Sequence, residues 1–199
     1  INSMTHTAGS FDGQRIIIGI AGGIASYKTA TLVSTLVQQS ATVNVLMTDA
    51  ACKFISPLTF SSLTGGEVYD SQWKFVDGHE PQHIKLANSA SLMIIAPCTM
   101  DMLAKLNLGR TDDPVSLVVS AIDRETTPVL LAPSMNEVMY RQPATQRNIG
   151  MLKDDGFQVL DPAFGWQACR TLGLGRMPDP ETLFEAIEAC LFKNSPISC

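Results

Sequence analysis

Short apolar runs alternate with helix-type patterns along almost the whole chain. The least interrupted runs are 15–20, 42–47, 92–96 and 128–132, and the first is followed by apolar residues at helical spacing over 26–39. Strands that are apolar on both faces are typical of the centre of a parallel sheet. The right-handed crossover rule then places helices on both faces of that sheet. The sequence therefore predicts one α/β domain with a Rossmann-like or flavodoxin-like parallel sheet.

The remaining segments are assigned by the same patterns. A short strand is expected at 158–160, and Thr48 or Asp49 is expected to cap a short helix through Phe54. The glycine-rich segment 163–178 is predicted to be a loop. Further helices are predicted at 57–63, 83–88, 100–108, 114–122, 136–140, 143–155 and 180–192.

Composition limits the class of protein. The 199 residues are 45% hydrophobic and 17% charged, which suits one well-buried domain. We expect that domain to cover 14–193, between a disordered N-terminus (1–13, with 1–3 as a remnant of cloning) and a tail (194–199). The net charge of -5 and the lack of a Lys/Arg block argue against nucleic-acid and membrane partners. No apolar signal or spanning segment is visible, which predicts a cytoplasmic protein.

The cysteines follow no metal-binding or disulfide pattern. Their number is odd, and none stands in a CxxC or Cys/His pair, so we expect reduced thiols and no metal site. Cys52, Cys98 and Cys190 are interpreted as small core residues. Cys169 differs because it lies among glycines and arginines in 167–177. It is a candidate nucleophile or acid on a loop that closes over a ligand, with an inert loop thiol as the alternative.

Three of the predicted strands are followed by segments that contain glycine, proline or polar residues. These segments are 21–26, 97–101 and 133–136, and ligands of parallel sheets bind beyond the carboxyl ends of strands. Gly22 and Gly23 allow a close approach to a ligand, and the helix that follows offers free N–H groups to a phosphate. Because the pattern is not GxGxxG, a mononucleotide is favoured over a dinucleotide. An ordinary tight turn remains the alternative.

Polar residues at these strand ends are candidates for ligand contacts. Thr99 and Asp101 have the groups to hydrogen-bond a ligand, and Asn136 offers both an amide donor and a carbonyl acceptor. Each of these positions is equally typical of a helix cap. His83 is a candidate base near neutral pH, with a structural histidine as the alternative.

Five segments taken together resemble one enzyme family. They are 22–28, 83–87, 96–99, 133–140 and 168–177, and 133–140 carries a Pro-x-Met-Asn-x-x-Met-aromatic pattern. In this order and spacing they are similar to the homo-oligomeric flavin-containing cysteine decarboxylases, over about residues 15–192. Within that family the likeness is greatest to the phosphopantothenoylcysteine decarboxylases, including the decarboxylase half of the bacterial bifunctional coenzyme A enzyme.

The resemblance implies FMN at a subunit interface of a trimer or dodecamer. It implies His83 as the catalytic base, Asn136 as the group that binds the substrate carboxylate, and Cys169 as the proton donor on a mobile flap. Met139, Gln167 and Ala168 are expected to contact substrate. The positions expected to bind FMN are Gly22, Gly23, Ile24, Ser26, Thr48, Thr99, Met100, Asp101, Met102 and Ser134.

The resemblance also implies a reaction. Loss of CO₂ from a cysteine carboxylate needs an electron sink, which the family creates by flavin-dependent oxidation of the cysteine side chain to a thioaldehyde. Decarboxylation leaves an enethiolate, which returned hydride and a proton from Cys169 convert to the saturated thiol. Peptide-processing relatives lack this cysteine and stop at the enethiol. Cys169 therefore favours (R)-4'-phospho-N-pantothenoylcysteine as the small-molecule substrate and 4'-phosphopantetheine as the product.

Some residues depart from the family pattern. Cys98, Met100 and Met102 replace smaller residues, and Arg170-Thr171 replaces the usual Gly-Asp after the donor cysteine. The second change keeps open a different cysteine-containing substrate, such as a peptide C-terminus. A non-catalytic regulatory flavoprotein is a third possibility, although no long acidic extension is present. The sequence contains no ligase domain, so a separate partner enzyme is expected.

Overall fold

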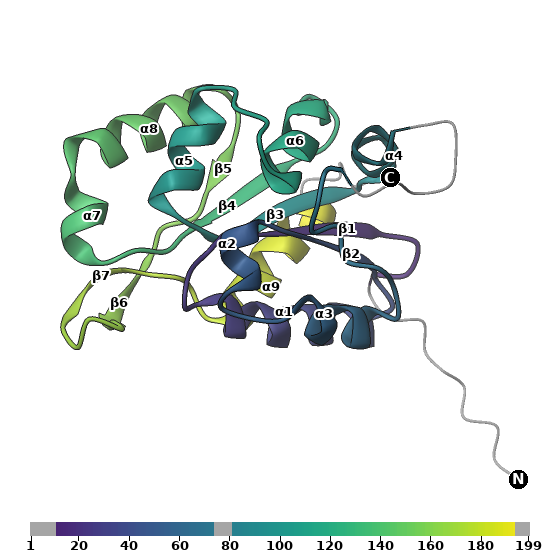
Figure 1. Ribbon diagram of the computed structural model, residues 1–199, viewed down its shortest axis with the longest axis horizontal. Coiled ribbons are helices and arrows are strands. Elements are labelled where there is room, and N and C mark those ends of the chain that lie inside the picture. The colour runs from purple at the N-terminus through teal and green to yellow at the C-terminus, as the bar shows by residue number, and fades with distance from the viewer. Residues whose placement is uncertain (1–10, 74–80, 194–199) are drawn as a thin grey trace, which may run out of the picture.

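The computed structural model describes residues 11–73 and 81–193, and its centre is a parallel sheet (Figure 1). The strands lie in the order β2 (Thr42–Met47), β1 (Arg15–Ile20), β3 (Leu92–Cys98), β4 (Val129–Pro133) and β5 (Gln158–Val159). All neighbouring strands in this sheet are parallel. The predicted α/β fold is confirmed, and the order 2-1-3-4-5 is the flavodoxin-like one.

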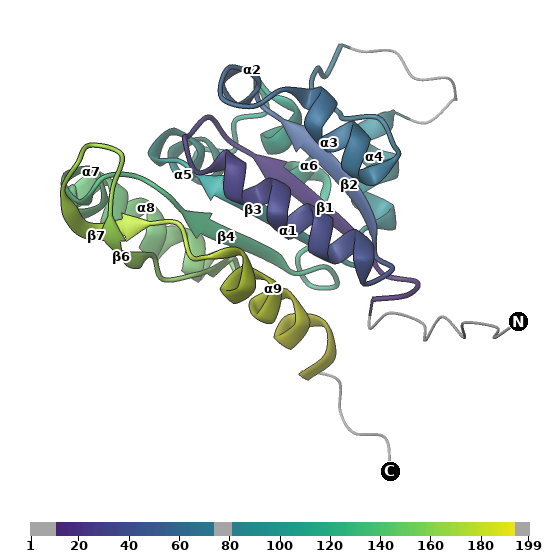
Figure 2. The same cartoon turned by 90° about the horizontal axis from the view of Figure 1, so that it is seen from below.

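Helices cover both faces of the sheet, as Figures 1 and 2 show. One face packs against α1 (Ser26–Gln38), α3 (Pro57–Thr64) and α9 (Pro180–Glu188). The other face packs against α4 (Gln82–Ser89), α5 (Met100–Asn107), α6 (Pro114–Ala121) and α8 (Pro143–Asp154). Short helical elements complete the chain: α2 (Asp49–Cys52), α7 (Glu137–Arg141) and η1 (Ala189–Lys193). The predicted helices lie within one or two residues of these bounds in most cases.

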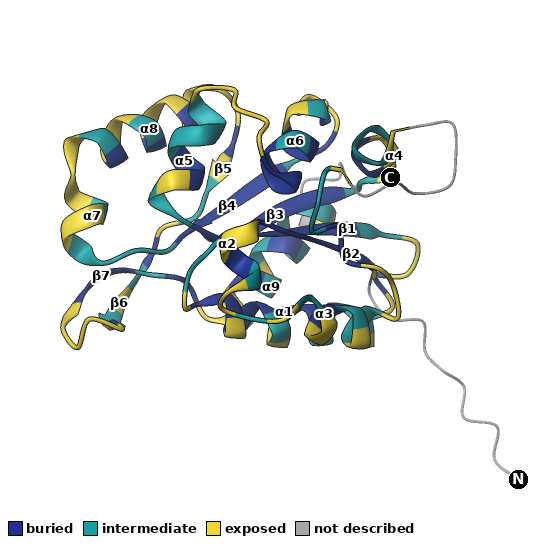
Figure 3. Cartoon of the chain, viewed as in Figure 1, coloured by how far each residue is buried: buried dark blue, intermediate teal, exposed yellow. Residues whose placement is uncertain are grey.

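Strand β1 shows why the sequence folds this way. Ile16, Ile18 and Ile20 pack in the core on the α1 face, and Ile17 packs in the core on the α6 face. All four side chains are completely buried, which is why the run shows no polar alternation. Figure 3 shows the same dark blue burial along β1, β3 and β4. Burial on both faces therefore explains the apolar runs from which the sheet was predicted.

Several boundaries differ from the sequence prediction. The helix expected through Phe54 ends at Cys52, and the helix expected over 180–192 is divided into α9 and η1. Strand β3 continues through Pro97 to Cys98 instead of ending at Ala96, and the Pro97 carbonyl accepts a hydrogen bond from the Ala21 N–H at 3.2 Å. Phe11 belongs to the segment that was expected to be disordered, yet its side chain is fully buried. Its ring packs against the rings of Phe184 in α9 and Phe192 in η1. Residues 1–10 of that segment and the expected tail (194–199) lie outside the described residues.

The prediction of a loop over 163–178 was wrong. This segment contains an antiparallel hairpin of β6 (Ala163–Trp166) and β7 (Leu172–Arg176). Glycines alternate with larger residues in β7, and a Cβ at Gly173 would lie 2.7 Å from Glu137 Oε2. The glycines therefore allow the strand to pack tightly against α7 instead of breaking it. Figures 1 and 2 show the hairpin beside α7.

Candidate functional site

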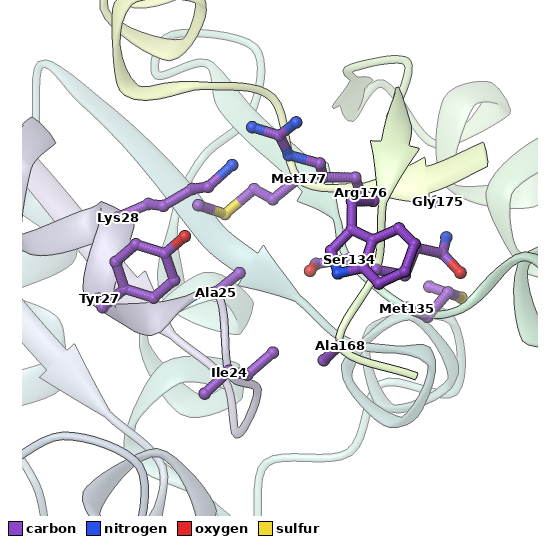
Figure 4. A pocket seen from close by; sticks show the side chains of 12 residues that line it. Ile24, Ala25, Tyr27, Lys28, Ser134, Met135, Ala168, Gly175, Arg176 and Met177 are labelled. Carbon is purple, nitrogen blue, oxygen red and sulfur yellow. The ribbon is translucent and has the colours of Figure 1, made fainter. Parts of the chain in front are cut away.

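The carboxyl ends of β1, β3 and β4 meet at one edge of the sheet, as the sequence predicted. A pocket of about 290 Å³ opens there, between the start of α1, the end of β4 and the hairpin (Figure 4). Four residues predicted to bind cofactor or substrate line it, namely Ile24, Ser134, Gln167 and Ala168. The position agrees with the rule that ligands of parallel sheets bind beyond the carboxyl ends of the strands.

The turn between β1 and α1 is held close to α2. A Cβ at Gly22 would lie 2.4 Å from the Ala50 Cβ, so only glycine fits at this contact. The buried Ser26 hydroxyl donates a hydrogen bond to the Gly23 carbonyl at 2.6 Å. Thr48 caps α2 by accepting a hydrogen bond from the Ala51 N–H at 3.1 Å. Ser26 and Thr48 therefore shape the turn through bonds within the chain.

This turn leaves backbone donors free for a ligand. Among the described residues, the N–H groups of Gly23, Ile24 and Ala25 donate no hydrogen bond, and Ala25 provides no side-chain cap for α1. No acidic residue lies in the first turn of α1. Free N–H groups at the positive end of a helix dipole are suited to an anion, and phosphate in particular. The geometry of the turn agrees with the predicted phosphate contact.

The start of α5 lies on the same edge. Thr99 caps the helix by accepting a hydrogen bond from the Met102 N–H at 3.2 Å. The Met102 side chain is only 1% exposed and packs in the core, so it contacts no ligand from there. The Asp101 side chain is 76% exposed, with Lys105 at 3.7 Å, and Met100 is half-buried. Thr99, Met100 and Asp101 thus remain accessible for contacts, whereas Met102 could offer only backbone atoms.

Asn136 is a helix cap, and its geometry leaves the predicted ligand contact possible. Its Oδ1 accepts a hydrogen bond from the Met139 N–H at 2.8 Å, so the residue caps α7. Its Nδ2 makes no hydrogen bond within the described residues, and therefore stays available to a carboxylate. Met139 itself is 40% exposed on the same short helix. Capping fixes the amide in place and orients the donor that the prediction needs.

Gln167 joins the hairpin to the start of α7. Its Nε2 donates to the Leu174 carbonyl at 3.1 Å, and its Oε1 accepts from the Glu137 N–H at 3.2 Å. The Gly175 carbonyl also accepts from the Met135 N–H at 2.9 Å. Gln167 is 7% exposed, so these bonds lie largely out of water. The hairpin is therefore fixed to the segment that contains Ser134 and Asn136.

Cys169 lies in the turn of the hairpin and is exposed. Its Sγ is 3.0 Å from Thr171 Oγ1 and donates a weaker bond to Gln167 Oε1 at 3.6 Å. Arg170 adopts the left-handed conformation, with φ of 64°. The thiol is therefore accessible, yet its direction is set by two polar neighbours. By contrast, Cys98 is completely buried, and burial raises the pKa of its thiol far above the usual range.

His83 is not part of this pocket. It lies half-buried in the first turn of α4, and Figures 1 and 2 show α4 well away from the hairpin. The structure brings the predicted cofactor residues, Asn136 and Cys169 to one edge of the sheet. It does not bring His83 to them within one chain.

Eight residues that line the pocket were given no individual role from the sequence. Four of them have an aromatic or charged side chain, namely Tyr27, Lys28, Trp166 and Arg176. Lys28 is the least expected, because its side chain is only 10% exposed. A lysine in the first turn of a helix, where the dipole disfavours a cation, is a signal that could have drawn attention to it.

Within the described ranges 11–73 and 81–193, no helix is long and apolar enough to cross a membrane. No group of three or more His, Cys, Asp and Glu side chains in these ranges is arranged to hold a metal ion.

A profile of the Flavoprotein family matches residues 4–192. The chain belongs to this family. Its flavodoxin-like fold and the free N–H groups of the turn before α1 are consistent with a flavin cofactor. The free N–H groups of Gly23, Ile24 and Ala25 fit the phosphate of a flavin mononucleotide, and the wall at Met135 and Met177 offers apolar surface.

Curated relatives include the Coenzyme A biosynthesis bifunctional protein CoaBC of Bacillus subtilis (strain 168). It is 41% identical to this chain over 175 residues. The alignment covers 88% of this chain and 42% of the relative. The chain thus spans about two-fifths of the length of that protein.

Two solved structures share the fold closely. A cysteine-to-serine mutant of PPC decarboxylase, complexed with pantothenoylaminoethenethiol, has a TM-score of 0.79 at 25% identity, covering 92% of this chain and 99% of that one. The FMN-dependent cysteine decarboxylase SpaF has a TM-score of 0.76 at 25% identity, covering 91% of this chain and 97% of that one.

Proposed function

We propose that the chain is an FMN-dependent carboxy-lyase that converts (R)-4'-phospho-N-pantothenoylcysteine to 4'-phosphopantetheine in coenzyme A biosynthesis. The observation that carries this proposal is the placement of Cys169. Its thiol lies on a hairpin that Gln167 and Gly175 fix to the segment containing Asn136. The proposed proton donor and the proposed carboxylate-binding amide thus belong to two segments that are bonded to each other, near the turn before α1 whose N–H groups are free. The likeness to CoaBC over 88% of this chain supports the same reaction.

The chain's own residues bind the substrate and move its protons. When bound, FMN supplies reversible oxidation of the cysteine side chain, which makes the loss of CO₂ possible. The Asn136 Nδ2 donates to the substrate carboxylate, since its Oδ1 is already used in the cap. Cys169 gives its Sγ proton to the carbon that becomes saturated. Met135, Met177 and Trp166 cover the pocket with apolar surface and limit the access of water.

Completion of the site requires a second copy of the chain. His83 is proposed as the base, yet α4 lies away from the pocket that Cys169 borders (Figures 1 and 2). Large apolar side chains are exposed around that pocket, including Ile24 at 59%, Phe164 at 68% and Trp166 at 63%. Such a surface is typical of an interface between subunits. We therefore propose a homotrimer, alone or within a dodecamer, in which one copy supplies His83 to the site of the next.

Mixed oligomers test this arrangement. His83→Asn and Cys169→Ser chains should each fail to form saturated product when expressed alone. When the two are co-expressed, some sites combine His83 from one chain with Cys169 from the other, and these sites should recover part of the activity. Mass spectrometry of the product and native mass spectrometry of the oligomers give the readout. Mixed oligomers without any saturated product would contradict the shared site.

A second candidate substrate is a peptide that ends in cysteine. Arg170 favours it, because this residue adds a positive charge beside the thiol where the family usually has glycine. The SpaF structure shows that the fold also occurs in other FMN-dependent cysteine decarboxylases. Turnover of phosphopantothenoylcysteine and of a peptide with a C-terminal cysteine, measured side by side, distinguishes the two. Either substrate is consistent with the cytoplasm, where thiols stay reduced.

A further inference from the structure

Two cations that line the pocket share a single carboxylate oxygen. Lys28 Nζ and Arg176 Nη2 each lie 2.7 Å from Asp179 Oδ1. Lys28 comes from the first turn of α1, Arg176 from the end of β7, and Asp179 from the start of α9. Lys28 is distant in sequence from Arg176 and Asp179, so the full cluster exists only in the folded chain.

A purely structural bridge between α1 and α9 would need one cation only. The Lys28 side chain is 10% exposed, and burial of an ammonium is costly unless an anion accompanies it. Asp179 balances that charge, but Arg176 adds a second one, which leaves the cluster with an excess positive charge. Among the described residues, the Nε and Nη1 groups of Arg176 have no hydrogen-bond partner. The cluster therefore has both the charge and the donors to accept another anion.

The position of the cluster indicates which anion it accepts. Figure 4 shows the ends of the Lys28 and Arg176 side chains on one side of the pocket, with Ile24 and Ala168 on the other. Ala168 precedes the thiol of Cys169, where the reacting end of the substrate belongs. An elongated substrate that is held at its cysteine end by the hairpin turn would extend toward the two cations.

We propose that Lys28 and Arg176 form a subsite for a phosphate monoester, and that its occupant in the flavin-loaded protein is the phosphate of the substrate. The identity of that substrate rests on the proposed function. The phosphate of FMN has a separate place, because the free N–H groups of Gly23, Ile24 and Ala25 lie in the turn before α1. Arg176 is the better side chain to vary, since its loss leaves the buried Lys28–Asp179 pair intact.

Binding without turnover tests the subsite. Flavin-loaded protein is titrated by calorimetry with phosphopantothenate and with pantothenate, neither of which carries the cysteine that reacts. The phosphorylated compound should bind about tenfold more tightly or better, since charge-assisted hydrogen bonds are worth that much. Arg176→Gln should remove most of this preference and leave the affinity for pantothenate and the FMN content unchanged.

Two further variants separate a subsite from a structural bridge. Asp179→Asn removes the competing anion and should strengthen phosphopantothenate binding, whereas a bridge that only shapes the pocket would make the variant bind both compounds more weakly. Arg110→Gln is the matched control, because Arg110 also pairs with an aspartate, Asp112, but does not line the pocket. It should bind like the unaltered protein.

The outcomes distinguish the subsite from the proposed function. Equal affinity for the two compounds, or an unchanged preference in Arg176→Gln, would overturn the subsite even if the protein decarboxylates phosphopantothenoylcysteine. Loss of FMN in Arg176→Gln with the preference retained would assign the cluster to the cofactor instead, and would also overturn it. A phosphate preference that depends on Arg176, in a protein without decarboxylase activity, would support the subsite and refute the proposed function.

Discussion

The Sγ of Cys169 and the Oγ1 of Thr171 lie 3.0 Å apart across the turn of the hairpin. Gln167 Oε1 accepts a weaker bond from the same sulfur at 3.6 Å. If the thiol proton points to Gln167, the Thr171 hydroxyl is free to donate to the sulfur. The thiolate that remains after Cys169 gives up its proton would then gain a hydrogen bond from Thr171.

Substitution of Thr171 should therefore change which product leaves the enzyme. Cys169→Ser should stop the reaction at the oxidised enethiol, and Thr171→Val should shift the product ratio the same way by a smaller amount, about tenfold or less. Thr171→Ser keeps the hydroxyl and should restore the saturated product. The ratio is measured by mass spectrometry. An unchanged ratio in Thr171→Val would show that the contact does not assist proton transfer.

Arg170 lies in a backbone region that favours glycine, with φ of 64°. Arg170→Gly should raise the free energy of unfolding by about 0.5–1 kcal/mol, because glycine adopts this conformation without a Cβ penalty. Arg110→Gly is a suitable control, since Arg110 is not in this region and should gain nothing. Urea denaturation measures both. A lower stability for Arg170→Gly would mean that the side chain contributes more than the strain costs.

Gly175 is the point at which the hairpin contacts the strand end of β4. It has φ of 127°, and a Cβ there would lie 2.5 Å from the Met135 carbonyl oxygen. Gly175→Ala should displace the hairpin and reduce decarboxylation by at least tenfold, while FMN stays bound. Gly109→Ala is matched in its positive φ of 64° but has no atom within 4 Å of the added Cβ, so activity should be retained. Normal turnover in Gly175→Ala would refute the role of hairpin docking.

Asp179 makes stability depend on pH. The hydrogen bond from Lys28, followed by the charges of Lys28 and Arg176, holds the pKa of its carboxyl below the usual value despite partial burial. A lowered pKa contributes stability that is present above the unfolded-state value near 4 and is lost as pH falls through the folded value. The stability difference between the unaltered protein and Asp179→Asn should thus be larger at pH 7 than at pH 3. A difference independent of pH would contradict the charged pairing.

Much of the fold could be predicted because strands that are buried on both faces of the sheet appear in the sequence as uninterrupted apolar runs. Ile16, Ile17 and Ile18 are apolar in succession since each meets a helix layer. The hairpin was missed because Gly173 and Gly175 look like loop residues. Only the structure shows that they give room to Glu137 and Met135. The local sequence around a glycine does not indicate which distant residues pack against it in the folded chain.

The candidate site was predictable where a candidate ligand-binding residue is also a helix cap. Asn136 and Thr99 proved to be helix caps, as the alternative reading held, and capping fixes each at the edge where a ligand contact was expected. Arg176 lies only three residues before Asp179, but the cluster was missed because only tertiary packing brings Lys28 to the same oxygen. The separation of His83 from the pocket likewise follows from the packing of α4, which the sequence did not reveal.

Turnover of phosphopantothenoylcysteine by the purified, flavin-loaded protein is the most direct test of the proposed function. We predict a yellow protein with a flavin absorption spectrum that releases CO₂ and forms 4'-phosphopantetheine, the saturated thiol, as measured by product mass. A yellow protein without turnover of this substrate would contradict the proposed decarboxylation. A colourless protein that cannot be reconstituted with FMN would contradict the assignment of the cofactor as well.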